Sequence, residues 1–453
     1  MSALDQYVKL YEANSGLFDA NSAPALNARR PEALKALEGA MLPTRRTEGY
    51  ERTSLEDLYA PDFGLNPGRV DIPVDLAATF KCAVPHMSTL LGVTVNDMFH
   101  ASGNLDERLP EGVTFMSLRR AAQDHPEIIE KYYGKLAPLT EPSTALNTLL
   151  AQDGVLIHLA PGARTQRPLQ LVNIFSSPVD LMAPRRVLIV AEENSSLELL
   201  VCDHTNDADH SYLASEVVEI HAGAGSRINM CTIEESSAKT SRHSSLYARQ
   251  ADGSQLEITG VTLTCGTTRN DYTIDIEGHH CTTRLSGMAI GGGKMHIDNN
   301  TSVNHRAAHC KSDQLFKYTL DDESTGSFEG SILVTGEAPF TEAYQSNRNI
   351  LAAEGARMHS KPRLEIYNDE VKCSHGATTG QLDSKALFYM QTRGIPMAEA
   401  RTLLMQAFMS DVIDRVGIEG LRERLRHLVE RRFARKDPSE SCGDCASVSP
   451  LTL

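Results

Sequence analysis

The tripeptide Cys373-Ser374-His375 is the part of this sequence best suited to chemistry. In an extended strand, alternate side chains lie on the same face, so the Cys373 thiol and the His375 imidazole would lie about 6–7 Å apart. A soft thiolate beside a borderline imidazole suits iron or an iron–sulfur cluster. Two ligands do not complete such a site, so we expect further ligands from another part of the fold or from another chain.

Three further clusters combine thiols and imidazoles. They are His279-His280-Cys281, then His305 with His309 and Cys310, and finally the pair Cys442 and Cys445. Alternation along a strand would place His279 and Cys281 on one face and His280 on the other, which does not favour a compact tetrahedral metal site. Packing on a strand face is therefore the main interpretation of both histidine clusters. The Cys-x2-Cys pair has no second pair and no thioredoxin-like context, so a redox or metal role is its minor interpretation.

The segment Gly291-Gly292-Gly293-Lys294 is the nearest match to a phosphate-binding loop, and it lacks the required residues. The pattern Gly-x4-Gly-Lys-Ser/Thr needs glycine where Met288 stands and a hydroxyl where Met295 stands. The segment also lies between predicted strands and does not open a helix. We therefore expect that this chain does not hydrolyse nucleotide by itself.

Length and composition exclude several classes of function. A chain of 453 residues can bury a large core in two or three regions, and its net charge of −15 disfavours binding to nucleic acid phosphates. The N-terminal residues match neither a signal peptide nor a transit peptide, and no segment approaches the roughly 18 apolar residues that span a bilayer. We expect a cytoplasmic protein with free thiols and no membrane contact.

Regular alternation of apolar residues from Val155 onward predicts β-strands. Small or glycine-containing turns precede these strands, mostly at spacings of 25 to 33 residues, which is typical of one rung of a β-solenoid. No long amphipathic helix separates the strands, so a doubly wound parallel sheet is disfavoured. A β-sandwich built from hairpins is the alternative, and the scarcity of Asn-Gly and Asp-Gly pairs favours the solenoid.

These patterns divide the chain into four predicted regions. Residues 1–150 form a helical and mixed N-terminal region, residues 151–380 a β-helix core, residues 381–436 a C-terminal helical region, and residues 437–453 a disordered tail. Two amphipathic helices are predicted in the third region. Capping of the last solenoid rung and docking of a partner are equally compatible with them.

Residues 305 to about 416 resemble the core of the SufB/SufD family of iron–sulfur cluster assembly proteins. The matching segments are HRAAHCKSDQLFKY (305–318), SFEGSILV (327–334), AYQSNRNILA (343–352), KPRLEIYNDEVKCSHGATTGQLD (361–383), LFYMQTRGI (387–395) and AEARTLLMQAFMSDVI (398–413). The segment CSHGAT and the N-terminal segment LPTRRTEGYERTSLEDL (42–58) resemble the SufD branch of this family. Tyr50 and Arg52 stand in that second segment where the branch usually has Trp and Tyr.

This resemblance implies a mainly β protein, with a right-handed parallel β-helix flanked by helical regions. It also implies a non-catalytic scaffold subunit in a complex with a SufB-type chain and a SufC-type ATPase. A nascent iron–sulfur cluster would be shared transiently at the interface with the SufB-type chain. His375 maps to the histidine that faces a partner cysteine, Cys373 is the neighbouring thiol, and the helices at 396–435 map to the surface that docks the ATPase. No flavin motif is present.

Three alternatives stay open. A β-solenoid can be a carbohydrate-active enzyme, which would require paired carboxylates in a groove. The chain can also be a purely structural paralogue in which Cys373 and His375 only pack. Finally, the isolated chain can form a homodimer in place of the heterodimer.

Overall fold

In the computed structural model, residues 2–72, 74, 88–101, 103–418 and 420–434 are described. The predicted tail at 437–453, with Cys442 and Cys445, lies outside these residues. No helix among the described residues is long and apolar enough to cross a membrane.

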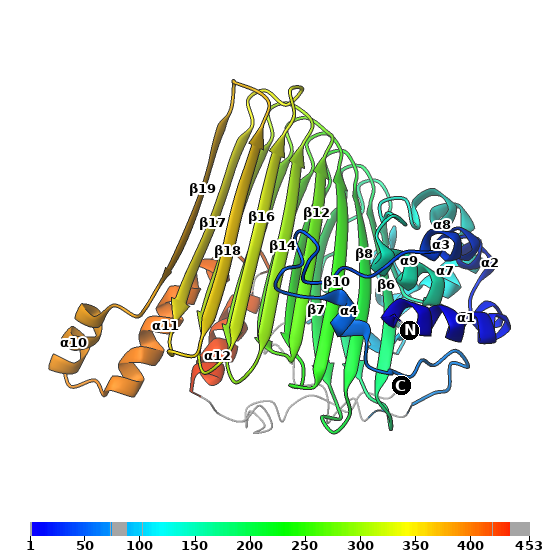
Figure 1. Cartoon of the computed structure of the whole chain (residues 1–453). Coiled ribbons are helices and arrows are strands. Elements are labelled where there is room, and N and C mark those ends of the chain that lie inside the picture. The colour runs from blue at the N-terminus through cyan, green and yellow to red at the C-terminus, as the bar shows by residue number, and fades with distance from the viewer. Residues whose placement is uncertain (1, 73, 75–87, 102, 419, 435–453) are drawn as a thin grey trace.

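Two parallel sheets form most of the molecule (Figure 1). The 10-stranded sheet contains, in spatial order, β19 (Lys372–Gly380), β17 (Glu342–Leu351), β15 (Lys311–Leu320), β13 (Thr282–Gly291), β11 (Gln255–Thr264), β9 (Arg227–Glu235), β7 (Ser196–Thr205), β5 (Leu169–Phe175), β1 (Leu90–Val95) and β2 (Met98–Ala101). The 9-stranded sheet contains β18 (Arg357–Ile366), β16 (Thr325–Val334), β14 (His296–His305), β12 (Thr267–Ile276), β10 (Thr240–Gln250), β8 (Tyr212–Ala222), β6 (Leu181–Ala191), β4 (Val155–Leu159) and β3 (Val113–Ser117).

The chain alternates between the two sheets, so each rung contributes one strand to each of them. Gln255 of β11 pairs with Thr282 of β13, and Thr282 pairs with Lys311 of β15, which agrees with the predicted rung spacing. Antiparallel pairing occurs only at the first edge, between β1 and β2 and between β3 and β4, among the strands of the described chain. The prediction of a parallel β-helix is confirmed.

Strand alternation directs one set of side chains into the space between the sheets. Residues such as Leu256, Leu285 and Ile297 are almost fully buried there and belong to one continuous apolar cluster. Each rung buries its inner face only against its neighbours, as expected for a solenoid. The last rung therefore lacks a neighbour on one side.

The N-terminal helices cover one end of the 9-stranded sheet on its outer face (Figure 1). They are α1 (Ala3–Ala20), α2 (Pro24–Asn27), α3 (Arg30–Leu37), α4 (Leu55–Tyr59), α7 (Leu118–Asp124), α8 (Pro126–Tyr132) and α9 (Pro142–Leu150). The short helix α6 (Leu105–Arg108) lies beside β1 instead, and its Leu105 belongs to the apolar cluster between the sheets. Pro126 occupies the first turn of α8, where its missing N–H is not needed. Every residue of α9 except Pro142 is buried.

The segment from residue 42 to α4 runs along the outer face of the 9-stranded sheet toward its later rungs (Figure 1). Thr53 donates a hydrogen bond of 2.6 Å to Asp298 of β14. The Arg269 guanidinium lies 4.0 Å from the centre of the Tyr50 ring, a cation–π contact. This segment therefore connects the N-terminal region to rungs that lie far from it in sequence.

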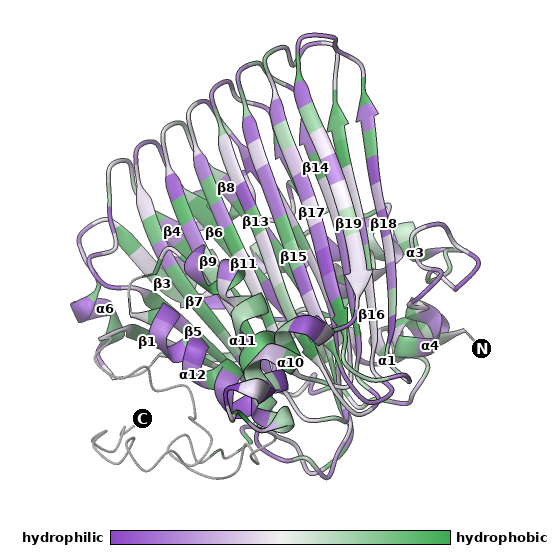
Figure 2. Ribbon diagram, turned by 90° about the vertical axis from the view of Figure 1, so that its left-hand side faces the viewer, coloured by the Kyte–Doolittle hydropathy of each residue, from purple (hydrophilic) through white to green (hydrophobic). Residues whose placement is uncertain are grey.

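The C-terminal helices are α10 (Ser384–Thr392), α11 (Met397–Asp414) and α12 (Leu421–Phe433). Met409, Ile413, Leu425 and Leu428 pack on the outward-facing apolar residues of the 10-stranded sheet. Figure 2 shows α11 and α12 in front of that sheet. These two helices lie on the side of the solenoid because its outer face carries an apolar stripe, and they leave the edge strand β19 exposed.

Candidate functional site at the open edge of the solenoid

Strand β19 carries both residues of the predicted site. It is the last strand of its sheet, and its register pairs Cys373 with Ala343 and His375 with Gln345 of β17. Cys373 is half-buried and packs against an apolar cluster that includes Ile332. Its side chain therefore points between the sheets, and that of His375, two residues further along, lies on the same face of β19.

The two side chains differ in exposure and protonation. His375 is exposed because no further rung covers it. Burial raises the pKa of the Cys373 thiol, so this group is protonated at neutral pH. His375 thus presents a ligand nitrogen to solvent, whereas Cys373 must lose a proton before it can act as a thiolate.

The inward-facing residues of β17 behind His375 are polar from Gln345 to Asn349, whereas those of an early strand such as β7, Leu197 and Leu199, are apolar. Gln345 has an exposed fraction of 3 %, and neither atom of its amide has a hydrogen-bond partner among the described residues. Its amide lies against Gly330 of β16, where an added Cβ would be 2.3 Å from the amide nitrogen. Asn347 and Asn349 hydrogen bond to one another at 2.7 Å and 3.1 Å.

Gln345 is not among the residues that the sequence patterns predicted for this site. A signal was present, because the strand AYQSNRNIL carries Gln345, Asn347 and Asn349 at successive inward positions. Their register partners in β15 are Gln314, Phe316 and Tyr318, so the preceding strand is only partly polar there. Buried polar groups without a partner are rare in proteins and call for an explanation. The unpartnered amide of Gln345 lies beside His375, its register partner in β19.

The backbone of the last rung offers a second kind of binding surface. β18 and β19 are the end strands of the two sheets, and both are largely exposed. An edge strand presents unpaired N–H and C=O groups that can pair with a strand of another chain. The predicted ligands therefore lie on a surface suited to the docking of a second chain.

The two histidine clusters differ from the expectation for strands. His280 and His309 lie in turns with φ values of 58° and 60°, so the strand alternation expected for His279, His280 and Cys281 is wrong. These turns carry the chain from one sheet to the other, and they stack the imidazoles of His280 and His309 at 4.9 Å. The same turns bring Cys281 and Cys310 together, and both thiols contact the carbonyl oxygen of Gly278 at 3.2 Å.

His305 does not join this group. It is fully buried in β14, where its Nε2 lies 2.8 Å from the Ser312 hydroxyl, and burial lowers its pKa to about 4. Its imidazole is therefore neutral at physiological pH. Within the described part of the chain, no three His, Cys, Asp or Glu side chains are arranged to hold a metal ion.

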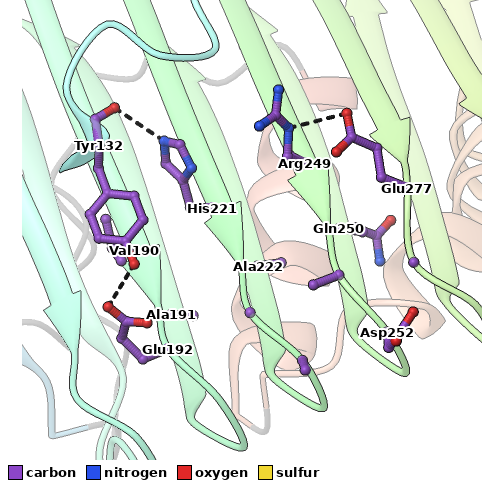
Figure 3. Close-up of a pocket in the computed structure, with 14 residues that line it drawn as sticks. Tyr132, Val190, Ala191, Glu192, His221, Ala222, Arg249, Gln250, Asp252 and Glu277 are labelled. Atoms are coloured by element: carbon purple, nitrogen blue, oxygen red, sulfur yellow. Dashed lines mark hydrogen bonds and ion pairs between the residues drawn. The ribbon is translucent and has the colours of Figure 1, made fainter.

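A side pocket of 460 Å³ on the 9-stranded sheet tests the carbohydrate-active alternative (Figure 3). Glu192 accepts a hydrogen bond of 2.7 Å from the Tyr132 hydroxyl, and Glu277 forms an ion pair of 3.3 Å with Arg249. Asp252 accepts a hydrogen bond from a backbone N–H. Glycoside hydrolysis requires two carboxylates free to act as acid and base or nucleophile. All three carboxylates of this pocket already have partners, so the pocket does not favour that chemistry.

The fold and the site together define a class of protein: a parallel β-solenoid with helical flanks, whose open end presents a thiol and an imidazole. The chain belongs to the SufB/SufD family. The SufBD core domain of SUF-system FeS cluster assembly matches residues 174–408, and the SufBD N-terminal region matches residues 1–171. The chain is thus a member of a family of iron–sulfur cluster assembly proteins.

Several curated relatives support this assignment over most of their length. A SufBD family iron–sulfur cluster assembly protein of Synechocystis is 28% identical over 412 residues, covering 89% of this chain and 90% of the relative. The SufD protein of Escherichia coli is 26% identical over 451 residues, covering 95% and 97%. The SufD protein of Bacillus subtilis is 25% identical over 340 residues, covering 74% and 78%.

Proposed function

We propose that this chain is a scaffold subunit that contributes His375 to a nascent iron–sulfur cluster at an interface with a SufB-type chain. The observation that carries the proposal is the position of His375, exposed on the uncovered inner face of the last rung. A partner strand that pairs with the edge of β18 or β19 would bring its own ligands to the same place. The isolated chain can use the same edges to form a homodimer.

The chemistry of the two ligands assigns them different roles. The His375 imidazole is a metal ligand in its neutral form, and its exposure lets it reach the cluster first. Cys373 follows as a thiolate once its proton is lost, because metal binding favours the deprotonated thiol. The cluster is the cargo of this site, and the partner chain supplies the ligands that this chain lacks.

A second surface fits a partner that hydrolyses ATP. Phe388 and Tyr389 of α10 have exposed fractions of 69 % and 58 %, and Met397 and Leu403 of α11 are also exposed. Helix α10 projects away from the solenoid (Figure 1). Exposed apolar groups of this size mark protein–protein contact sites. We assign this surface to a SufC-type ATPase, which extends the predicted docking region of 396–435 to include α10.

The partner would supply the nucleotide chemistry, since the sequence carries no phosphate-binding loop. In this proposal the chain is not an enzyme and acts in the cytoplasm. ATP-driven movement of α10 and α11 would be transmitted to the solenoid through the contacts of α11 and α12 with the 10-stranded sheet.

The test is co-expression of the chain with SufB-type and SufC-type partners, followed by measurement of iron and acid-labile sulfide in the purified complex. His375→Ala is expected to lower the cluster content at least fivefold while the complex stays intact. Ser374→Ala is the matched control, because Ser374 is also exposed but lies on the opposite face of β19. Equal cluster content in the wild type and in His375→Ala would refute the assignment of the site.

A further inference from the structure

A column of small polar side chains lies at the turns that lead into the 10-stranded sheet. Its members, each no more than 1 % exposed, are Ser195, Ser226, Ser254, Cys281, Cys310 and Thr341. The hydroxyls of Ser195 and Thr341 donate to the carbonyl oxygen three residues earlier, at 2.6 Å and 2.8 Å. A hydroxyl at this position can therefore stabilise the turn by this hydrogen bond. Two successive rungs carry a thiol at the same position.

The two thiols occupy equivalent positions of neighbouring rungs. The next residues, Thr282 and Lys311, are register partners in β13 and β15. Neighbouring strands lie about 4.7–4.9 Å apart, and a disulfide joins Cα atoms that are about 4.4–6.8 Å apart. Both thiols point at the same carbonyl oxygen, that of Gly278. The backbone thus holds Cys281 and Cys310 at a separation that a disulfide can bridge.

The surroundings make the two sulfurs chemically unequal. A hydrogen bond from Cys310, with smaller contributions from Ser254 and nearby backbone N–H groups, lowers the pKa of Cys281 to about 7. The same contact with Cys281, together with burial, raises the pKa of Cys310. Of the two sulfurs, Cys281 is therefore the one that loses its proton more easily, and the thiolate is the form that reacts with oxidants.

The pair lies one residue beneath the surface. His280 and His309, which directly precede the two cysteines, are exposed and stack on one another, and His309 also stacks on Phe340 of the following rung. Access to the sulfurs requires only a local opening of these surface turns, and hydrogen peroxide is small enough to use it. Local openings of this kind cost less than global unfolding.

We propose that Cys281 and Cys310 form a peroxide-oxidisable thiol pair that closes to a disulfide between two rungs of the solenoid. The Cys281 thiolate attacks one oxygen of hydrogen peroxide, the O–O bond breaks, and the departing hydroxide takes a proton and leaves as water. The Cys310 sulfur then attacks the resulting sulfenic acid. The S–S bond forms, and the sulfenic hydroxyl leaves with the Cys310 proton as a second water. Two electrons pass from the sulfurs to the peroxide.

The disulfide would connect β13 and β15 covalently. It rests on contacts that do not involve His375, so it is independent of the proposed cluster site. A disulfide between rungs stabilises the folded chain because it restricts the conformations of the unfolded chain.

The experiment treats the purified full-length chain with hydrogen peroxide, blocks remaining thiols by alkylation, and maps disulfide-linked peptides by mass spectrometry. A Cys442→Ser/Cys445→Ser background removes the thiols of the tail. The expected result is a linked peptide pair containing Cys281 and Cys310, together with a raised unfolding midpoint that falls back on reduction. Cys373→Ser is expected to leave this product unchanged.

Two single variants separate the roles of the sulfurs. Cys310→Ser should leave Cys281 as a sulfenic acid that a dimedone probe captures, whereas Cys281→Ser should leave Cys310 reduced. Serine stands at the equivalent position in neighbouring rungs, so both variants are expected to fold, which circular dichroism checks. If Cys281 and Cys310 are both fully alkylated when the peroxide-treated chain is denatured, or if they link to other cysteines, the proposal is wrong.

Discussion

The substitution Gly330→Ala probes the packing directly behind the proposed cluster ligand. A Cβ at this position would lie 2.3 Å from the amide nitrogen of Gln345 and 2.8 Å from the ring of Phe328. Both contacts are far inside van der Waals distance, so the amide and the ring must move. Overpacking of this kind costs about 1–3 kcal/mol. The Gln345 amide makes no hydrogen bond in the described structure, so the cost is steric and no bond is lost.

Gly376→Ala is the matched control. Gly376 lies in β19 beside His375, and an added Cβ there meets no atom within 4 Å. Removing the conformational freedom of a strand glycine stabilises by about 0.5–1 kcal/mol. The two glycine substitutions are therefore expected to change the free energy of unfolding in opposite directions. The assay is urea unfolding followed by circular dichroism on the isolated chain.

The double variant Gly330→Ala/Gln345→Ala tests the cause of the destabilisation. If the clash with Gln345 is responsible, the double variant is more stable than the sum of the two single effects predicts, by about 1 kcal/mol or more. Additive effects would show that the amide of Gln345 does not occupy the space beside Gly330. An unchanged free energy in Gly330→Ala would refute the packing described for this rung.

Further predictions concern a buried ion pair between β6 and β8 and the exposed surface of α10. Glu219 pairs with Arg186 at 2.8 Å, and both side chains are fully buried, so Glu219→Gln should destabilise the fold by about 3–5 kcal/mol. The matched control Glu257→Gln breaks a partly exposed pair with Arg284 and should cost at most about 1 kcal/mol. Arg186 and backbone N–H groups lower the pKa of Glu219. Its contribution to the free energy of unfolding is therefore complete above the pKa of the unfolded state and is lost as pH falls through the pKa of the folded state. In urea unfolding at pH 7 and pH 4, the stability of Glu219→Gln should depend less on pH than that of the wild type. The double variant Phe388→Ala/Tyr389→Ala removes two exposed aromatic groups of α10 and should weaken binding of the SufC-type partner at least tenfold. Titration calorimetry measures this affinity, and scanning calorimetry should show an unchanged unfolding midpoint. Unchanged affinity would contradict the assigned docking surface.

The features that were predictable from the sequence are those that depend on local periodicity. Alternation and a recurring turn are local signals, and they indicated the solenoid correctly. The same alternation placed Cys373 and His375 on one face, and the structure has both in one strand with that register. It failed for His279-His280-Cys281, because a backbone with positive φ at His280 turns the chain where a strand was expected.

The sequence by itself determined the repeat, the family and the thiol–imidazole pair of β19, since each of these is carried by residues close together in the chain. Only the tertiary structure decided which residues of different rungs meet. Inter-strand register brought Cys281 to Cys310, placed Gln345 behind His375 and against Gly330, and left β19 uncovered. The tertiary structure also decided that α11 and α12 lie on the side of the solenoid. The physical reason is that burial acts between segments, and an apolar stripe on one helix does not specify which of several apolar surfaces will cover it.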